Sequence, residues 1–258
     1  MSAIATQVGA IAMRSIARTV RQPASFIPPL IFPTMLLLVN SGGLASATGL
    51  EGFPTDSFFA FALAVPFIQG ALFSTMNAGT DLARDIQTGF LSRLSLTPLR
   101  GSALLAGTLG GVVALGQVQT AFYVLVGLAA GVDFHAGLLG VAVLFAFASI
   151  VSLGFGALGS FMALRTGSGE AIQGLFPLLF VFLFISSMNM PRNLIEIDWF
   201  RAAATANPVS YLLECVRSLI ITGWDGEALA LGFGVAGAIA VVAIGLSAVA
   251  LKERLART

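Results

Sequence analysis

GLLGVAVLFAFASIVSLGFGALGSFMAL, residues 137–164, contains no charged side chain. About 20 apolar residues suffice for a helix to cross the roughly 30 Å hydrocarbon core of a bilayer. The stretch is long enough to cross with some tilt. It therefore predicts a membrane-spanning helix.

The composition extends this prediction to the whole chain. Of 258 residues, 57% are hydrophobic and only 10% are charged, whereas a soluble domain carries about 25% charged residues. We therefore expect an all-α membrane protein with six transmembrane helices in a single domain, residues 1–258. The predicted spans are approximately 25–44, 57–80, 101–130, 137–164, 171–189 and 228–251.

The first span has a competing interpretation as a secretory signal peptide. The segment from Arg14 to Arg21 precedes an apolar run, and the sequence Leu44-Ala45-Ser46-Ala47 resembles a cleavage site. The charged region is unusually long for a signal peptide, and the run contains three prolines. We therefore expect the span to be retained.

Basic residues are distributed unequally between the two sides of the predicted bundle. Placing both termini on one side puts ten basic residues there, namely Arg14, Arg18, Arg21, Arg84, Arg93, Arg100, Arg165, Lys252, Arg254 and Arg257. The other side receives Arg192, Arg201 and Arg217, with eight of the twelve acids. Because cytoplasmic loops are enriched in Lys and Arg, we expect both termini to be cytoplasmic.

Residue counts exclude several chemistries. One cysteine, Cys215, and one histidine, His135, allow no intramolecular disulfide and no multi-His metal cluster. The single lysine, Lys252, is not part of a phosphate-binding P-loop. Any ATP hydrolysis must therefore occur on another polypeptide. A net charge of +1 gives no sign of nucleic-acid binding.

Residues 3–22 are predicted to form a helix that lies in the cytoplasmic interface. Arg14, Arg18 and Arg21 fall on one helical face, and basic groups there can meet anionic headgroups. The opposite face carries Ala5, Ala12, Ile16 and Val20, while Ile11 on the basic side breaks the pattern. A simple topology anchor explains the same segment.

The loop over residues 81–98 is predicted to be a short cytoplasmic helix. It is too polar to enter lipid, and Phe90, Leu91 and Leu94 recur at helical spacing. Such an apolar edge can dock into a groove of a partner protein. Pro98 ends the helix. An ordinary amphipathic surface helix is the alternative.

The stretch between the last two spans is long for a simple loop. Asn207-Pro208 interrupts it, and the following apolar residues form a helical stripe too short to cross the membrane: Val209, Leu212, Leu213, Val216, Leu219 and Ile220. We expect two short helices over 192–222, hinged at Asn207-Pro208, that dip into the outer leaflet. Glu214 and Arg217, spaced i, i+3, should either pair with each other or both face water.

Span five is rich in phenylalanine. Phe176, Phe180, Phe182 and Phe184 offer rings without polar groups, which suit an apolar ligand. Phe176, Phe180 and Phe184 are therefore candidate residues of a substrate path. Packing inside the bundle or contact with lipid is the more common explanation for such rings.

Two motifs resemble a known family. ARDIQTGFLSRLSLTPL is similar to the loop R-E-x-x-x-G-T-L-E-R-L-x-x-T-P-L, and NPVSYLLECVRSLI is similar to N-P-x-x-Y-x-x-E-x-x-R. Both occur in permease subunits of the ABC-2 type transporter family, which includes daunorubicin-resistance-like drug and lipid exporters. With six spans and an N-terminal interfacial helix, the resemblance covers essentially the whole chain.

The resemblance implies roles for the matched residues. A coupling helix would contact a separate ATPase through Arg84, Asp85, Gln87, Gly89, Phe90, Leu91, Arg93 and Leu94. Outer gate helices would include Asn207, Pro208, Tyr211, Glu214 and Arg217. Ser92 replaces the usual acid before Arg93, and Asp85 and Gly89-Phe90 also depart from the pattern, which leaves individual ion pairs at the ATPase contact open.

The implied function is export of an amphipathic drug, lipid or glycolipid out across the bacterial inner membrane. The permease would work as a dimer, with an identical or homologous copy, beside two ATPase subunits that bind ATP and Mg²⁺. No residue of this chain would catalyse a reaction.

Two other classes compete with the exporter. An ion-coupled carrier usually keeps ionisable groups deep in its spans, but the polar residues here are neutral: Asn40, Gln69, Asn77, Gln117, Gln119, Gln173 and Asn189. An intramembrane enzyme needs clustered acids or histidines, and only Asp81 and Asp85 come close to that pattern.

Overall fold

The structure, a computed structural model, describes residues 8–14, 17, 27–95 and 101–256. Within these ranges the regular elements are helices and no strand occurs, which confirms the all-α prediction. The principal helices are α3 (Pro28–Gly43), α4 (Phe58–Ala62), α5 (Ala64–Gln87), α6 (Phe90–Ser95), α7 (Gly101–Ala129), α8 (Gly137–Thr166), α9 (Gly169–Phe184), α10 (Asp198–Ala206), α11 (Pro208–Arg217) and α12 (Gly226–Leu255). The shorter elements are the 3-10 helices η1 (Ala45–Gly49) and η2 (Arg192–Leu194) and the π-helix η3 (Ser218–Thr222).

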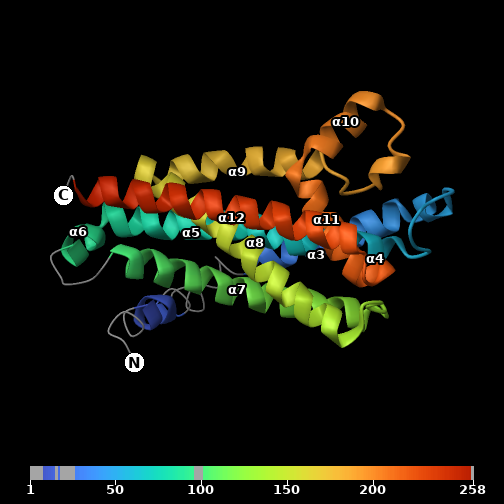
Figure 1. The fold of residues 1–258 in the computed structure, drawn as a ribbon, viewed down its shortest axis with the longest axis horizontal. Coiled ribbons are helices and arrows are strands. Elements are labelled where there is room, and N and C mark those ends of the chain that lie inside the picture. Colours follow the sequence, from blue (N-terminus) through green and yellow to red (C-terminus); the bar gives the residue numbers. More distant parts are fainter. Residues whose placement is uncertain (1–7, 15–16, 18–26, 96–100, 257–258) are drawn as a thin grey trace.

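The long helices α5, α7, α8, α9 and α12 run along the length of the molecule (Figure 1). Helix α6 and the last residues of α12 lie at one end, which we call the α6 end. Helix α10 projects at the opposite end, which we call the α10 end. Residues 8–14 are helical and lie beside α7 near the α6 end. The remainder of the predicted 3–22 helix, including Arg18 and Arg21, lies outside the described residues.

Among the described residues, four helical segments are long and apolar enough to cross a membrane. They are Phe58–Gln87, Gly101–Ala129, Gly137–Thr166 and Gly226–Leu255. They coincide with four of the predicted spans, and the protein is a multi-pass membrane protein. Helices α3 and α9 match the other two stretches but have only 16 residues each. The count of six spans therefore stays a prediction.

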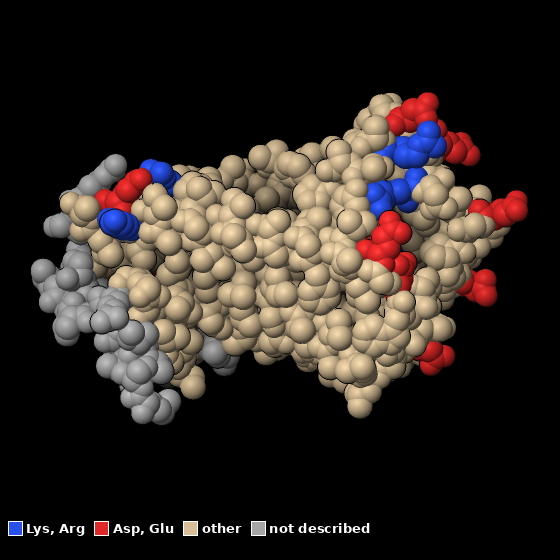
Figure 2. Space-filling view, in the orientation of Figure 1, with Lys and Arg blue, Asp and Glu red and all other residues tan. Residues whose placement is uncertain are grey.

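On the face shown in Figure 2, charged side chains concentrate at the two ends and the middle of the molecule carries none. Acidic groups gather at the α10 end in the same view. This separation is what an apolar membrane slab imposes, because a charge at the bilayer centre costs about 2.5–3.5 kcal/mol.

Helix α8 occupies the centre of the bundle and approaches three neighbours through glycines. A Cβ at Gly159 would overlap the carbonyl of Thr75 on α5. At Gly156 it would lie 2.7 Å from Val112 on α7, and at Gly154 it would lie 3.1 Å from the backbone nitrogen of Ala240 on α12. Small residues allow helix backbones to approach this closely in lipid.

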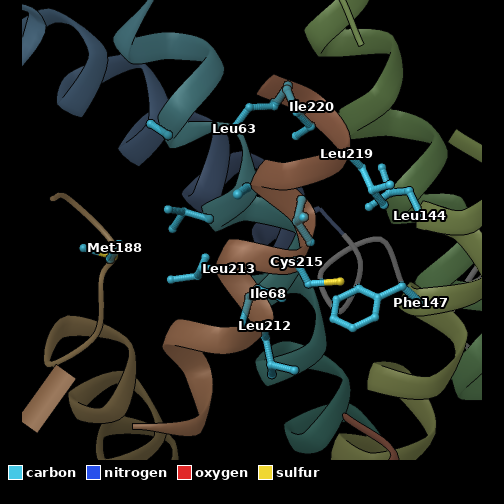
Figure 3. Close-up of a cluster of buried hydrophobic side chains, with 14 of the residues drawn as sticks. Leu63, Ile68, Leu144, Phe147, Met188, Leu212, Leu213, Cys215, Leu219 and Ile220 are labelled. Carbon is cyan, nitrogen blue, oxygen red and sulfur yellow. The ribbon is translucent and has the colours of Figure 1, made fainter. Parts of the chain in front are cut away.

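Helix α11 is inserted into the core rather than lying on the surface. Leu212, Leu213 and Cys215 are fully buried, as are the neighbouring side chains Val216 and Ile220. Figure 3 shows α11 passing between α5 and α8, with the Cys215 sulfur directed toward the Phe147 ring. The apolar stripe that follows Asn207-Pro208 therefore packs against the bundle.

Candidate functional site: a coupling corner and an outer gate

The predicted helix over 81–98 is divided at Gly89. Helix α5 continues to Gln87, and α6 begins at Phe90. Gly89 has φ +68°, in the left-handed region that glycine occupies without steric cost. The chain therefore turns a corner at Gly89, and we call residues 84–95 the coupling corner. Residues 96–98 lie outside the described part of the chain.

The N-terminal helix is attached to this corner through Arg14. Its guanidinium forms an ion pair with Asp85 and lies 4.2 Å from the centre of the Phe90 ring. Asp85 is 6% exposed, so its charge is largely withdrawn from water. One arginine thus holds the end of α5 and the start of α6 together.

Ile11, which breaks the amphipathic pattern, has a packing role. It lies against α7, where a Cβ added at Gly107 would be 2.5 Å from the Ile11 Cβ. Gly107 thus provides the space that Ile11 fills. Two contacts therefore attach the helix over 8–14 to the bundle: the apolar packing of Ile11 against α7 and the ion pair of Arg14.

The coupling residues divide into an exposed and a buried set. Arg84, Gln87 and Arg93 are exposed, and Phe90 is partly exposed. Leu91 is only 3% exposed and packs in the core of its own chain. The expectation that Leu91 belongs to a docking edge was therefore wrong, because the turn at Gly89 directs it inward. The side chain of Leu94 lies outside the described part of the structure.

At the α10 end, Asn207 forms the hinge between α10 and α11. Its side-chain oxygen accepts a hydrogen bond from the Val209 amide at 2.9 Å, which caps α11. Pro208 follows at the first helical position, where its missing N–H costs nothing. The Asn207 amide group also donates to the carbonyls of Phe182 and Ile185. The hinge is therefore tied to the end of α9.

Arg217, at the end of α11, is buried and bonded to backbone. Its guanidinium donates to the carbonyls of Phe61 at 3.1 Å, Ser187 at 2.6 Å and Met188 at 2.6 Å. It also lies 3.5 Å from the Phe61 ring centre. The Ser187 and Met188 carbonyls belong to the irregular chain after α9. Arg217 thus joins α4, α11 and this segment.

Glu214 pairs with a different arginine from the one expected. Arg192 donates to both carboxylate oxygens of Glu214, at 2.7 and 2.5 Å, and stacks on Tyr211 at 4.5 Å. The expectation that Glu214 and Arg217 pair with each other or both face water was therefore wrong. Arg217 obtains its hydrogen bonds from carbonyls, which lets it remain charged and buried while Glu214 bonds elsewhere.

Both arginines have altered acidities. Partial burial alone would lower the pKa of Arg192, but the hydrogen bond and negative charge of Glu214 raise it above its usual value. Burial lowers the pKa of Arg217, and the charge of nearby Glu214 opposes this shift.

A cavity of about 570 Å³ opens between these groups at the α10 end. Arg192, Arg217 and Glu214 line it, together with Arg201 from α10 and Asp225 before α12. Tyr211, which donates to the Thr205 carbonyl at 2.8 Å, connects α11 to α10 behind this cavity. The five predicted gate residues therefore lie on one hinged unit, and the structure adds Arg192 to it.

The candidate path residues form a continuous series of rings. Phe176, Phe180 and Phe184 follow one another along α9, with ring centres 4.8 and 6.3 Å apart. Phe73 of α5 and Phe32 of α3 extend the series, at 5.0 Å from Phe176 and 5.9 Å from Phe180. Phe32 and Phe184 are about half exposed. The series thus runs from a buried ring to the surface of the bundle.

Sequence reasoning missed Arg192 and the Arg14–Asp85 pair. Arg192 follows Pro191 in an irregular loop, where no helical spacing relates it to Glu214. The partner of Asp85 lies 71 residues away in sequence. The burial of Asp85 near the end of α5 marks it as a paired residue, but burial is not visible in the sequence.

Comparison with known proteins confirms the family that the coupling-loop motif and the Asn207-Pro208 motif resemble. The sequence model of the ABC-2 type transporter family matches residues 6–221. The chain is 33% identical over 227 residues to the daunorubicin resistance ABC transporter permease protein DrrB1 of Streptomyces coeruleorubidus. The aligned region covers 86% of this chain and 73% of that protein. This chain belongs to the ABC-2 type transporter family, as a membrane-embedded transport subunit.

Proposed function

We propose that this chain is the permease of an ATP-driven exporter that moves an amphipathic drug, lipid or glycolipid out of the cell. Two permease chains would work beside two cytoplasmic ATPase subunits, and these partners would bind ATP and Mg²⁺. Membership in the family and the drug-resistance role in the name of its relative support this assignment.

The coupling corner carries the proposal. It presents Arg84, Gln87 and Arg93 to solvent, and the Arg14–Asp85 ion pair fixes it to the N-terminal helix. Gln87 also donates to the Gly167 carbonyl at 3.1 Å, which ties the corner to the loop between α8 and α9. An ATPase that pushes on this rigid corner moves α5, α9 and the N-terminal helix together.

The orientation is part of the proposal. The α6 end, where Arg84 and Arg93 of the coupling corner lie with Arg165, Lys252 and Arg254, faces the cytoplasm, and the α10 end, where acidic groups gather (Figure 2), faces outward. Helices α10 and α11 then form the outer gate of a protein in the bacterial inner membrane.

The phenylalanine series along α3, α5 and α9 is proposed to line the substrate path. Only Ile172 and Leu183 of α9 are buried, so most of this helix is free to contact another molecule. A second permease chain placed against α3 and α9 would enclose the half-exposed rings Phe32 and Phe184. The resulting apolar surface suits a hydrophobic or amphipathic substrate.

Charge reversal at the coupling corner tests ATPase docking. Arg84→Glu should reduce co-purification with the ATPase and stimulation of its turnover, and so should Phe90→Asp, which places an acid beside Asp85. Arg201→Glu, an exposed arginine at the α10 end, is the matched control and should change neither. Normal assembly and turnover in both corner variants would contradict the coupling role.

Cysteine labelling tests the orientation and the gate. In a Cys215→Ala background, a cysteine replacing the exposed Asp225 should react with a membrane-impermeant thiol reagent added outside. A cysteine replacing the partly buried Tyr211 should react poorly. Labelling of the Asp225 variant only from the cytoplasm would reverse the topology, and strong labelling of both from outside would exclude a packed gate helix.

Substrate profiles test the path. Phe180 contacts the four other rings of the series, so Phe180→Ala should alter which hydrophobic substrates are exported at unchanged expression. Identical transport of every substrate tested would favour a packing role for the series.

A further inference from the structure

The second large cavity of the described structure is an apolar groove at the α6 end, remote from the outer gate. It has a volume of about 790 Å³ and lies between α7 and α12, with Leu153 of α8 among its lining residues. On α7 it runs from Gly101 to Gly110, and on α12 from Ile244 to Leu255. We call it the α7/α12 groove.

The length of the groove fits one leaflet of a bilayer. The eleven residue steps from Ile244 to Leu255 correspond to about 16 Å along a helix axis. One leaflet contributes about 15 Å, half of the roughly 30 Å hydrocarbon core. An acyl chain of a lipid in that leaflet can therefore lie along the whole groove.

The mouth of the groove carries a positive charge and a hydroxyl. Lys252 and Ser102 line it, and both are exposed. Among the described residues no acid pairs with Lys252, because the adjacent Glu253 bonds Arg165 at 2.8 Å. The neighbouring Arg254 donates to the Leu164 carbonyl at 2.6 Å. Lys252 is thus available to a ligand, and its aliphatic stem can follow the apolar wall while the ammonium reaches the headgroups.

We propose that the α7/α12 groove binds an anionic phospholipid of the cytoplasmic leaflet, with an acyl chain between the helices and the phosphate group at Lys252 and Ser102. The leaflet assignment uses the orientation proposed above, whereas the binding itself does not. A basic group at the cytoplasmic end of an apolar groove attracts anionic headgroups. A helix from a second copy of the chain fits the groove less well, because it would bury the Lys252 charge, which has no acidic partner among the described residues.

The groove also adjoins the parts that transmit motion. Gly101 is the first described residue after the coupling corner, and a Cβ at Gly110 would contact Ala12 of the N-terminal helix at 3.6 Å. A lipid in the groove would therefore lie against the start of α7, the segment of α7 that also contacts the N-terminal helix.

Lipid binding by the full-length chain in detergent provides the test, because it depends on neither the ATPase nor the orientation. Native mass spectrometry would compare phosphatidylglycerol with phosphatidylcholine of identical acyl chains. The wild type should prefer phosphatidylglycerol by about fivefold, the factor that corresponds to about 1 kcal/mol per basic side chain. Lys252→Gln should remove this preference, and Lys252→Arg should retain it.

Filling the groove tests the acyl chain separately. Ala248 lines the groove and is exposed, so Ala248→Phe should lower retention of both lipids without unfolding the chain. Equal binding of the two lipids by the wild type would overturn the proposal, as would a preference that survives Lys252→Gln. Efficient disulfide cross-linking of Ala248→Cys chains in a Cys215→Ala background would identify a second copy as the occupant instead.

Discussion

Replacing Arg217 by methionine should destabilise the protein by about 3–5 kcal/mol, the usual cost of leaving buried charged-group partners unpaired. Methionine keeps much of the side-chain length but removes all three hydrogen bonds to the carbonyls of Phe61, Ser187 and Met188. A hydrogen bond from a charged donor contributes about 1.5–3 kcal/mol. Three would sum to about 4.5–9 kcal/mol if additive. Relief of the buried guanidinium's desolvation cost offsets part of that sum, by several kcal/mol.

The free energy of unfolding can be measured by titrating the protein in mild micelles with SDS while following far-UV circular dichroism. The free energy of unfolding of Arg217→Lys should lie between those of the wild type and Arg217→Met, because one ammonium cannot reach three carbonyls in the geometry of a guanidinium. Arg201→Met is the control, since the side chains of Arg201 and its partner Asp198 are 47% and 88% exposed. Exposed pairs contribute about 0–1 kcal/mol. If Arg217→Met lost no more stability than Arg201→Met, the linking role of Arg217 would be refuted.

The other predictions concern the outer gate and its packing. Arg192 and Glu214 should show a coupling energy of about 1–2 kcal/mol in a double-mutant cycle of unfolding free energies, because their bidentate pair is three-quarters buried; additive single effects would show that the pair forms no interaction in the membrane. Gly232→Ala should cost about 1–3 kcal/mol through overpacking, since a Cβ there would overlap that of Cys215. Gly234 lies two residues further along α12, and a Cβ there would meet no other atom within 4 Å. Gly234→Ala should therefore leave the free energy of unfolding unchanged or slightly higher. Equal losses of stability in both variants would indicate a general effect of alanine on the helix and not overpacking.

The sequence predicts those features that depend on local pattern. The uncharged run 137–164 corresponds to α8, Gly137–Thr166, because apolar length alone determines whether a helix can cross lipid. Asn207-Pro208 predicts a helix boundary for an equally local reason, since proline excludes a continuous helix.

Features set by distant contacts could not be predicted. The i, i+3 spacing suggested that Glu214 pairs with Arg217, but the strongest partner of Glu214 lies 22 residues away in an irregular loop. Leu91 has the same apolar character as Phe90, and only the turn at Gly89 decides which of the two is buried. Ile11 contradicted the amphipathic pattern because its partner is a glycine on α7, which no single-helix pattern reveals.

The glycine contacts of α8 have a mechanical consequence. Where the backbone of α8 touches the backbones of α5 and α12, no side chains remain to rearrange between them, so we expect these three helices to move as one stiff frame. Helix α5 has 24 residues and a length of about 36 Å. It reaches from the coupling corner to the neighbourhood of Phe61, whose carbonyl holds Arg217. A tilt of about 5° at one end of such a rod displaces the other end by about 3 Å. A small push at Gln87 thus acts on the outer hinge as through a lever, with no chain of intermediate side-chain switches.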